Sequence, residues 1–347
     1  MAWKAAGAVR EVVGVARRAE TLAEAIRLGA IDRGTLHPEE GAEGADVVVI
    51  ATPVRTIVPV AEAIQKCLKP GAVVTDVGST KAWVCEAVWR AYGEDALFIG
   101  GHPMAGSERA GVGAADPYLF QNAPYVLVPP PRPAQEGLAL LERLVRATGA
   151  VPMVMSAAEH DAIVATVSHL PHMVAASLVN TATRRSETFP ALLQLAAGGF
   201  RDTTRVASGL EDVWLDICQT NARPIVESID VFIDVLTQLR DALSAGDEER
   251  LRSALAAARR AREQLPAKSK GILGTVYDLV VRVEDRPGAI HGVTGVISRA
   301  GINIIDIEIL RVREGEGGTL RLGFEREEDL QEALRLLREA GYQARSR

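Results

Sequence analysis

Residues 46–53 read DVVVIATP, a nearly continuous apolar run of β-branched residues that stops at a threonine and a proline. Residues 72–80 (AVVTDVGST) repeat this pattern and stop at a glycine and a serine, and residues 11–16 (EVVGVA) form an earlier run. Helical segments separate these runs, and apolar strands alternating with helices indicate a parallel sheet covered on both faces. Ligands of such sheets bind at the carboxyl ends of the strands, so the loops after Ala51 and Val77 are candidate binding positions.

The strand-and-helix pattern continues and then becomes purely helical. Two further strands are expected at residues 125–128 and 151–155, with a helix between them. From about residue 156 to residue 265 the apolar spacing is helical and turn signals are few. The sequence therefore predicts an α/β domain over residues 1–156 and an all-helical domain over residues 157–266.

The C-terminal part has a different periodicity. Residues 266–271 (PAKSKG) have the composition of a linker. The expected elements after it are strands at 276–283, 302–312, 320–324 and 342–345 and helices at 289–300 and 329–340. The order βαββαβ is the ferredoxin-like pattern, which predicts a third domain over residues 271–347.

Composition narrows the classes of function. The 347 residues carry a net charge of −6 without a basic stripe, which argues against nucleic acid and anionic membranes as partners. The three cysteines, Cys67, Cys85 and Cys218, are far apart, so neither a disulfide framework nor a metal site is expected. No apolar run is expected to reach the length of a membrane span, and the first residues lack a signal-peptide core. A cytoplasmic location is the default.

A histidine between glycines is the strongest chemical signal. Residues 100–108 (GGHPMAGSE) follow an apolar run and predict a loop that presents the imidazole of His102. Histidine titrates near neutral pH, so it suits proton transfer, although a lone loop histidine more often caps local structure.

Two weaker signals lie in the helical part. In residues 168–172 (SHLPH), the proline predicts a helix start, with His172 at its positive end, where an anion is favoured. In residues 198–205 (GGFRDTTR), Asp202 is expected to cap a helix, and Arg205 has the fork geometry that binds a carboxylate. Taken singly, each residue also fits an ordinary structural role.

Together these segments resemble one family. HPMAGSE, SHLPH and GGFRDTTR, in this order and spacing, are similar to the prephenate dehydrogenase family. The resemblance covers nearly the whole chain and implies a Rossmann-like domain, a helical dimerisation domain and a C-terminal ACT domain. It also implies a homodimer that oxidises prephenate with NAD(P)⁺ and releases CO₂, giving 4-hydroxyphenylpyruvate for tyrosine biosynthesis.

The resemblance implies roles for individual residues. His102 matches the base that takes the proton of the ring hydroxyl, and Ser79 matches the serine that holds this histidine and meets the nicotinamide. Arg205 matches the arginine that binds a substrate carboxylate, and His172 matches a second substrate-binding histidine. The residues that match the lining or gate of the pocket are Ser107, Glu108, Asp202 and Trp214.

Two alternatives stay open from the sequence. Arogenate dehydrogenase would use the same pocket for a substrate that carries an amino group. The second alternative is a protein without catalytic activity, a regulator that binds an amino acid through its ACT domain. An unusual feature of the nucleotide-binding part supports this alternative.

That part departs from the usual pattern, since the chain lacks an opening strand with a G-x-G-x-x-G turn. Met1 is therefore expected to be an internal methionine, with the first strand of the sheet missing and the start roughly thirty residues upstream. The remaining candidates for cofactor contacts are Arg17, Thr52, Pro53, Gly78 and Ser79. NAD is the expected cofactor, and NADP is left open because alanine, followed by two arginines, stands where an acidic residue would hold the ribose.

The C-terminal domain carries a candidate effector loop. Asp285 and Gly288 precede a helix, and Asn303 and Ile304 follow it. In the ACT domains that this segment resembles, such loops bind an amino acid, and L-tyrosine is the expected effector. The alternative is a dimerisation module without a ligand.

Overall fold

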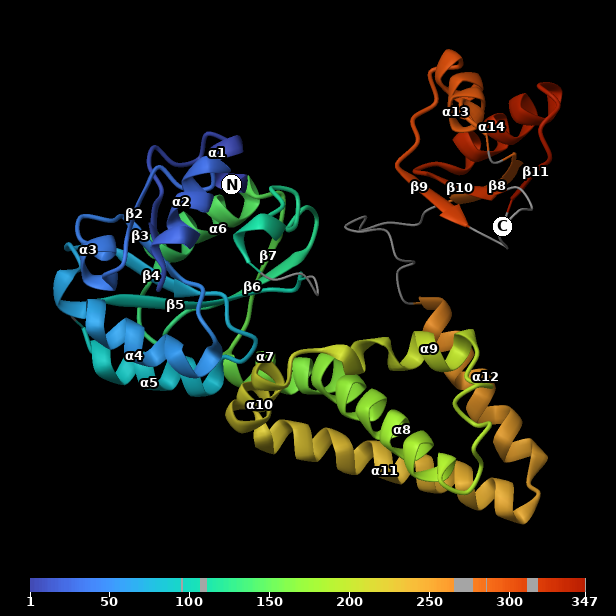
Figure 1. The fold of residues 1–347 in the computed structure, drawn as a ribbon, viewed down its shortest axis with the longest axis horizontal. Helices are drawn as coiled ribbons and strands as arrows, with labels where there is room; N and C mark the ends of the chain where they lie inside the picture. Colours follow the sequence, from blue (N-terminus) through green and yellow to red (C-terminus); the bar gives the residue numbers. More distant parts are fainter. Residues whose placement is uncertain (95, 107–110, 265–276, 285, 311–317, 347) are drawn as a thin grey trace. The chain divides into compact units, whose positions relative to one another are not determined.

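The computed structural model describes residues 1–347 except 95, 107–110, 265–276, 285, 311–317 and 347. The chain divides into two compact units, Met1–Glu248 and Glu249–Arg347 (Figure 1). Each unit has a buried core of its own.

A five-stranded sheet organises the first unit. Its order is β3-β4-β5-β6-β7. The strands are β3 (Val47–Ile50), β4 (Val73–Asp76), β5 (Leu97–Pro103), β6 (Pro124–Val128) and β7 (Val151–Val154). All neighbours are parallel except β5 and β6, which run antiparallel. This departs from the predicted parallel sheet. A parallel pair needs a long crossover connection, and the described residues between β5 and β6 contain only the short 3₁₀ turn Val112–Ala114.

Two shorter strands stand apart from this sheet. β1 (Val13–Val15) and β2 (Arg33–Thr35) pair with each other in parallel. They are connected by α2 (Ala19–Arg27), and α3 (Pro38–Ala42) follows β2. The described residues therefore build a Rossmann-like domain in two pieces, a parallel pair of strands and a mostly parallel five-stranded sheet.

Helices bury both faces of the central strands. α4 (Val54–Ile64) and α5 (Ala82–Tyr92) pack Ile57, Ile64, Val88 and Tyr92 into one core. On the other face, α6 (Gln135–Ala147) packs Leu141, Leu144 and Val145 against β4 and β5, and Trp3 of α1 (Ala2–Ala5) joins them. Polar groups of these strands therefore gather where the strands end.

One continuous helix connects the sheet to the helical part. α7 (Ala157–Val164) passes through a π turn, Ala165–His169, into α8 (Leu170–Ser186). Pro171 lies in the first turn of α8, as predicted, but α8 continues from the preceding turn, so the expected free helix terminus beside His172 was wrong. The π turn lies just before Pro171, which has no N–H to donate, and the helix continues past it. His172 thus lies mid-helix, without a helix terminus beside it.

By length and composition alone, the helix Ala157–Ser186 could cross a membrane, with hydropathy of 1.5 in its most apolar window. The expectation that no apolar run reaches such a length was wrong. The same helix carries the buried polar side chains of His160, Asp161, His169 and His172.

Four more elements complete the helical part of this unit. They are α9 (Gly198–Thr204), the 3₁₀ turn η4 (Arg205–Ser208), α10 (Glu211–Thr220) and α11 (Ala222–Ala245). Hydrogen bonds tie this part to the sheet: the hydroxyl groups of Thr80 and Thr220 are 2.8 Å apart. The backbone N–H of Arg55 donates to Asp216 over 3.4 Å.

The second unit contains α12 (Glu248–Gln264) and a βαββαβ fold, as predicted. The fold comprises β8 (Tyr277–Val283), α13 (Ala289–Arg299), β9 (Asp306–Leu310), β10 (Gly318–Phe324), α14 (Glu327–Glu339) and β11 (Ala344–Ser346). The sheet is antiparallel in the order β11-β8-β10-β9, and α13 and α14 share its core.

Candidate functional site

His102 lies inside a strand, where the sequence had predicted a loop. It belongs to β5 and pairs with Val126 of β6. The loop prediction was wrong because the glycines serve close packing: a Cβ on Gly101 would collide with the carbonyl oxygen of Asp76. The strand therefore continues to Pro103 and holds His102 on a rigid element.

The ring of His102 contacts a second imidazole from the long helix. Nδ1 of His102 and Nε2 of His160 are 2.8 Å apart, with the rings nearly edge to face. Nδ1 of His160 lies 2.8 Å from Oδ1 of Asp161. His160 and Asp161 are both buried, whereas His102 is only partly covered.

The carboxylate of Asp161 also binds the start of α5. It accepts hydrogen bonds from the backbone N–H groups of Lys81, over 2.7 Å, and Ala82, over 2.8 Å. The N-terminus of a helix favours a negative charge, so these contacts stabilise the ionised carboxylate. Asp161 thereby joins the loop that carries Ser79 to the histidine pair.

A buried ion pair braces the same region from inside the sheet. The ammonium of Lys81 binds Oδ2 of Asp76, and both side chains are fully buried. Asp76 also accepts the N–H groups of Gly78, over 2.8 Å, and Gly101, over 2.9 Å. One carboxylate thus fixes the loop after β4 and the strand next to His102.

The environment keeps His102 neutral. Burial, the neighbouring His160 and the Lys81 ammonium hold the pKa of His102 well below its usual value of 6.5. A neutral imidazole can accept a proton, so the ring is ready to act as a base at neutral pH.

A second cluster surrounds Trp214. His172 stacks on its indole ring with a centroid distance of 3.5 Å, and His169 meets it edge-on at 6.1 Å. Nδ1 of His172 is buried and has no hydrogen-bond partner among the described residues. Burial lowers the pKa of His169 to about 4 and also lowers the pKa of His172.

Asn221 links the two clusters. Its side-chain amide donates to the carbonyl of Asp161 over 2.9 Å and lies 3.2 Å from Nδ1 of His169. Contacts therefore lead from His102 through Asp161 and Asn221 to His169 and Trp214. Of the predicted site residues, this network includes His102, His172 and Trp214.

The other predicted substrate residues are placed less directly. Ser79 is partly buried in the loop between β4 and α5. Arg205 is exposed at the start of η4, next to Val206, whose backbone contacts His172. Asp202 lies exposed within α9, whose N-cap is Ala197, so the predicted capping role was wrong. Ser107 and Glu108 lie outside the described residues.

The cofactor candidates follow three parallel strands. Arg17 is exposed after β1, Thr52 and Pro53 are exposed after β3, and Gly78 follows β4. A Cβ on Gly78 would approach both Oδ2 of Asp76 and Ile57 to 2.8 Å, so this tight loop requires glycine. Within the described part of the chain, no three His, Cys, Asp or Glu side chains gather as metal ligands.

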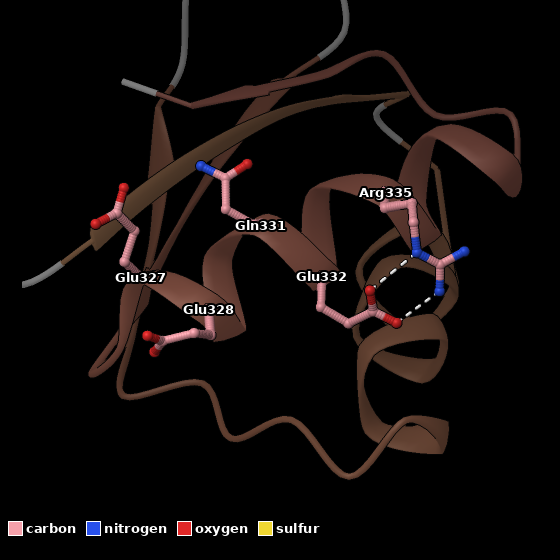
Figure 2. Close-up of a pocket in the computed structure, with 5 residues that line it drawn as sticks. All are labelled: Glu327, Glu328, Gln331, Glu332 and Arg335. Atoms are coloured by element: carbon pink, nitrogen blue, oxygen red, sulfur yellow. Dashed lines mark hydrogen bonds and ion pairs between the residues drawn. The ribbon is translucent and has the colours of Figure 1, made fainter.

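The effector candidates belong to the second unit. Gly288 is the N-cap of α13 and has φ 85°, a conformation that favours glycine. Asn303 is exposed and Ile304 is partly buried, while Asp285 lies outside the described residues. Figure 2 shows a hollow on this unit, lined by residues of α14 that include the ion-paired Glu332 and Arg335. Gly288, Asn303 and Ile304 do not line it.

Sequence reasoning missed the residues behind His102, namely His160, Asp161, Asp76, Lys81 and Asn221. The adjacent His160-Asp161 pair was the available signal, because a carboxylate beside an imidazole often orients it.

Comparisons with known proteins agree on one family. The family described as "Prephenate dehydrogenase, nucleotide-binding domain" matches residues 1–154, and its "dimerization domain" matches residues 156–257. The family described as "ACT domain" matches residues 277–341.

Individual relatives give the same picture. A prephenate dehydrogenase of Bacillus subtilis (strain 168) is 36% identical over 325 residues, covering 93% of this chain and 88% of the relative. The crystal structure of a prephenate dehydrogenase from A. aeolicus with hydroxyphenyl propionate and NAD⁺ is 30% identical, with a TM-score of 0.72 over 76% of this chain and 92% of that one. A Synechocystis arogenate dehydrogenase structure is also 30% identical, with a TM-score of 0.69 over 76% and 95% of the two chains.

Proposed function

Because the chain belongs to the prephenate dehydrogenase family, we propose that it oxidises prephenate with NAD(P)⁺ and releases CO₂ to give 4-hydroxyphenylpyruvate. The observation that carries this proposal is His102, a neutral and partly open imidazole on a rigid strand beside the loop of Ser79. Such a group can remove the proton of the ring hydroxyl as the carbonyl forms.

Loss of CO₂ restores an aromatic ring, so the substrate supplies much of the driving force. The protein has to orient the ring and accept one proton. His102 takes that proton, and Ser79 orients the hydroxyl near the nicotinamide. The buried network of Asp76 and Asp161 holds both residues in place.

We assign the substrate carboxylates to the neighbourhood of His172 and Arg205. Nδ1 of His172 is buried, and none of the residues that the structure describes bonds to it, which is costly unless a ligand completes its hydrogen bonding. A guanidinium such as that of Arg205 binds a carboxylate with two parallel hydrogen bonds. Trp214 holds the ring of His172 by stacking, and Asp202, Ser107 and Glu108 are assigned to the rim of the pocket.

The residues present fit part of a dinucleotide. The loops at Arg17, Thr52-Pro53 and Gly78-Ser79 are suited to the adenosine ribose and the nicotinamide, whereas the 347 residues contain no glycine-rich turn for the diphosphate. When bound, the cofactor would accept the hydride. Arg17 stands near the position of a ribose-binding acid, so NADP⁺ is to be compared with NAD⁺.

Purified full-length chain supplied with prephenate and either cofactor tests the proposal. Formation of NADH or NADPH together with 4-hydroxyphenylpyruvate is the expected result. Turnover with arogenate but not with prephenate would show that the preferred substrate carries an amino group, as the name of the Synechocystis relative suggests. No turnover with either substrate, and no binding of NADH or NADPH, would contradict the proposal.

We further propose a cytoplasmic homodimer that responds to an amino acid. The helical part exposes apolar side chains on α11, including Val231 at 67% and Leu236 at 54%, which a partner subunit would cover. The loops at Gly288 and at Asn303-Ile304 are assigned to an α-amino acid, with L-tyrosine as the first choice. Sedimentation tests the dimer, and calorimetry tests tyrosine; no heat at millimolar tyrosine would favour a structural role for the ACT domain.

A further inference from the structure

The hydrogen bonds of Asp161 determine where its neighbour carries a proton. Both of its carboxylate oxygens accept backbone N–H groups, Oδ1 from Lys81 and Oδ2 from Ala82. An ionised carboxylate can only accept, so the contact of Oδ1 with Nδ1 of His160 requires a proton on that nitrogen. In a neutral ring, Nε2 of His160 is then the acceptor.

The acceptor role of His160 determines where His102 carries its proton. Nε2 of His160 lies 2.8 Å from Nδ1 of His102, and one of the two nitrogens has to donate. Since Nε2 of His160 accepts, Nδ1 of His102 carries the proton. Nε2 of His102 is left with a lone pair, and no hydrogen bond of the described residues reaches it.

We propose that Asp161 and His160 form a proton relay behind His102, which fixes its proton on Nδ1 and takes that proton up when Nε2 accepts another. The proposal rests on the proposed function for the source of the incoming proton. His160 and Asp161 are positioning residues, since neither touches the substrate in this arrangement. In many enzymes a carboxylate orients the catalytic histidine directly, and here the imidazole of His160 stands between the two.

Two proton transfers follow one another in the relay. The O–H bond of the ring hydroxyl breaks, and its proton bonds to Nε2 of His102. The Nδ1–H bond of His102 breaks, and that proton bonds to Nε2 of His160, so His102 is neutral again. The imidazolium of His160 then forms an ion pair with Asp161, and the O–H electron pair becomes part of the new carbonyl as the hydride leaves.

The charges around the pair favour this direction. Lys81 and His169 also face His102, but Asp76 neutralises the ammonium of Lys81. His160 is the ring in direct contact with a carboxylate. When the proton passes from His102 to His160, the positive charge therefore moves next to a carboxylate.

Two variants of His160 in the full chain test the relay. His160→Leu can neither orient His102 nor take up its proton. With prephenate, kcat should fall about a hundredfold while KM changes less than about twofold. His160→Gln keeps an oxygen that accepts from Nδ1–H but cannot take up the proton, so it should recover about tenfold of that loss. His37→Leu, which alters an exposed histidine at the N-cap of α3, is the matched control and should keep the original kcat.

Nitrogen-15 NMR of His102 gives a readout that a purely structural role would not change. In the unaltered chain, Nδ1 should be protonated and Nε2 bare, and His160→Leu should give a mixture of the two tautomers. A proton on Nε2 in the unaltered chain, or full kcat in both variants, would overturn the relay. If His160→Leu fails to fold, His160→Gln and the spectrum of the unaltered chain decide. If the unaltered chain does not turn over prephenate, the proposed function fails, and the spectrum still tests the relay.

Discussion

Each unit of the chain contains a charged cluster around a buried side chain, and the two clusters differ in whether every polar atom has a partner. In the second unit, the guanidinium of Arg321 binds Asp278 over 2.8 Å, Asp306 over 2.5 Å and Glu308 over 2.9 Å. In the first unit, the chain of contacts from Asp161 ends at His102, whose Nε2 has no partner in the described part of the structure.

The difference separates a structural cluster from a reactive one. Burial and charge occur in both, so they do not by themselves indicate chemistry. Among the described residues, two ring nitrogens of the first cluster have no hydrogen-bond partner, Nε2 of His102 and Nδ1 of His172. A network whose other polar atoms are hydrogen-bonded, but which leaves one atom without a hydrogen bond, points to a ligand at that atom.

The largest effect is expected from the open end of the first cluster. His102→Asn should lower kcat about a thousandfold, because an amide cannot accept the proton of the hydroxyl. Near-normal substrate binding is expected, and it can be measured by equilibrium titration with prephenate. Turnover close to that of the unaltered chain would remove His102 from the mechanism. The first cluster would then be structural, like the second.

A change in the cluster of Arg321 should lower the free energy of unfolding of the second unit. Arg321→Gln leaves three carboxylates without their common partner and should destabilise the second unit by about 3 kcal/mol. All four tryptophans lie in Met1–Glu248, so calorimetry should show a lowered transition that tryptophan fluorescence does not follow.

Arg326→Gln is the matched control in the same unit. Arg326 is exposed, and the variant breaks its pair with the partly buried Asp329, so the unfolding of the second unit should change much less than in Arg321→Gln. Equal destabilisation by both variants would contradict the importance of burial in the cluster of Arg321.

Arg205→Gln should affect binding more than stability. Loss of a charged, two-pronged contact to a carboxylate should raise KM ten- to a hundredfold, with a smaller change in kcat. Steady-state kinetics and tryptophan fluorescence melts measure the two quantities. An unchanged KM would remove Arg205 from the substrate site.

The sequence predicted β1, β3, β4, β6, β7 and the βαββαβ order because these follow from periodicity and from turn residues, but it missed β2 and β5. Residues 46–53 became β3, and residues 72–80 contain β4. The same reasoning failed at residues 100–103, where glycine signalled a turn but serves the close approach of two strands. Local composition does not distinguish these two uses of glycine.

The residues behind His102 could not be predicted for a different reason. His160 lies 58 positions away in sequence, and its contact depends on how α7 packs at the end of β5. The continuation of that helix past Pro171 depends on a π turn, for which the sequence offers no periodic signal. Contacts of this kind are set by tertiary packing and become visible only in three dimensions.

The smallest expected effect concerns the pH dependence of stability. His169 is buried with a pKa of about 4, against an ordinary value of 6.5. Above pH 6.5 the ring is neutral in both the folded and the unfolded chain. As the pH falls from 6.5 towards 4, only the unfolded chain binds the proton, so the folded state loses stability. This group should cost the first unit about 1–2 kcal/mol between pH 7 and pH 5.

Urea unfolding followed by tryptophan fluorescence at several pH values measures this loss. His169→Asn keeps an acceptor for Asn221 but does not titrate, so its stability should fall less steeply with decreasing pH. His37→Asn, at an exposed position, should keep the slope of the unaltered chain. His102 and His172, whose pKa values burial also lowers, act in the same direction, so some slope remains in every variant. An identical slope in His169→Asn would mean that His169 binds a proton in the folded chain and that its cluster is more open to water than its burial indicates.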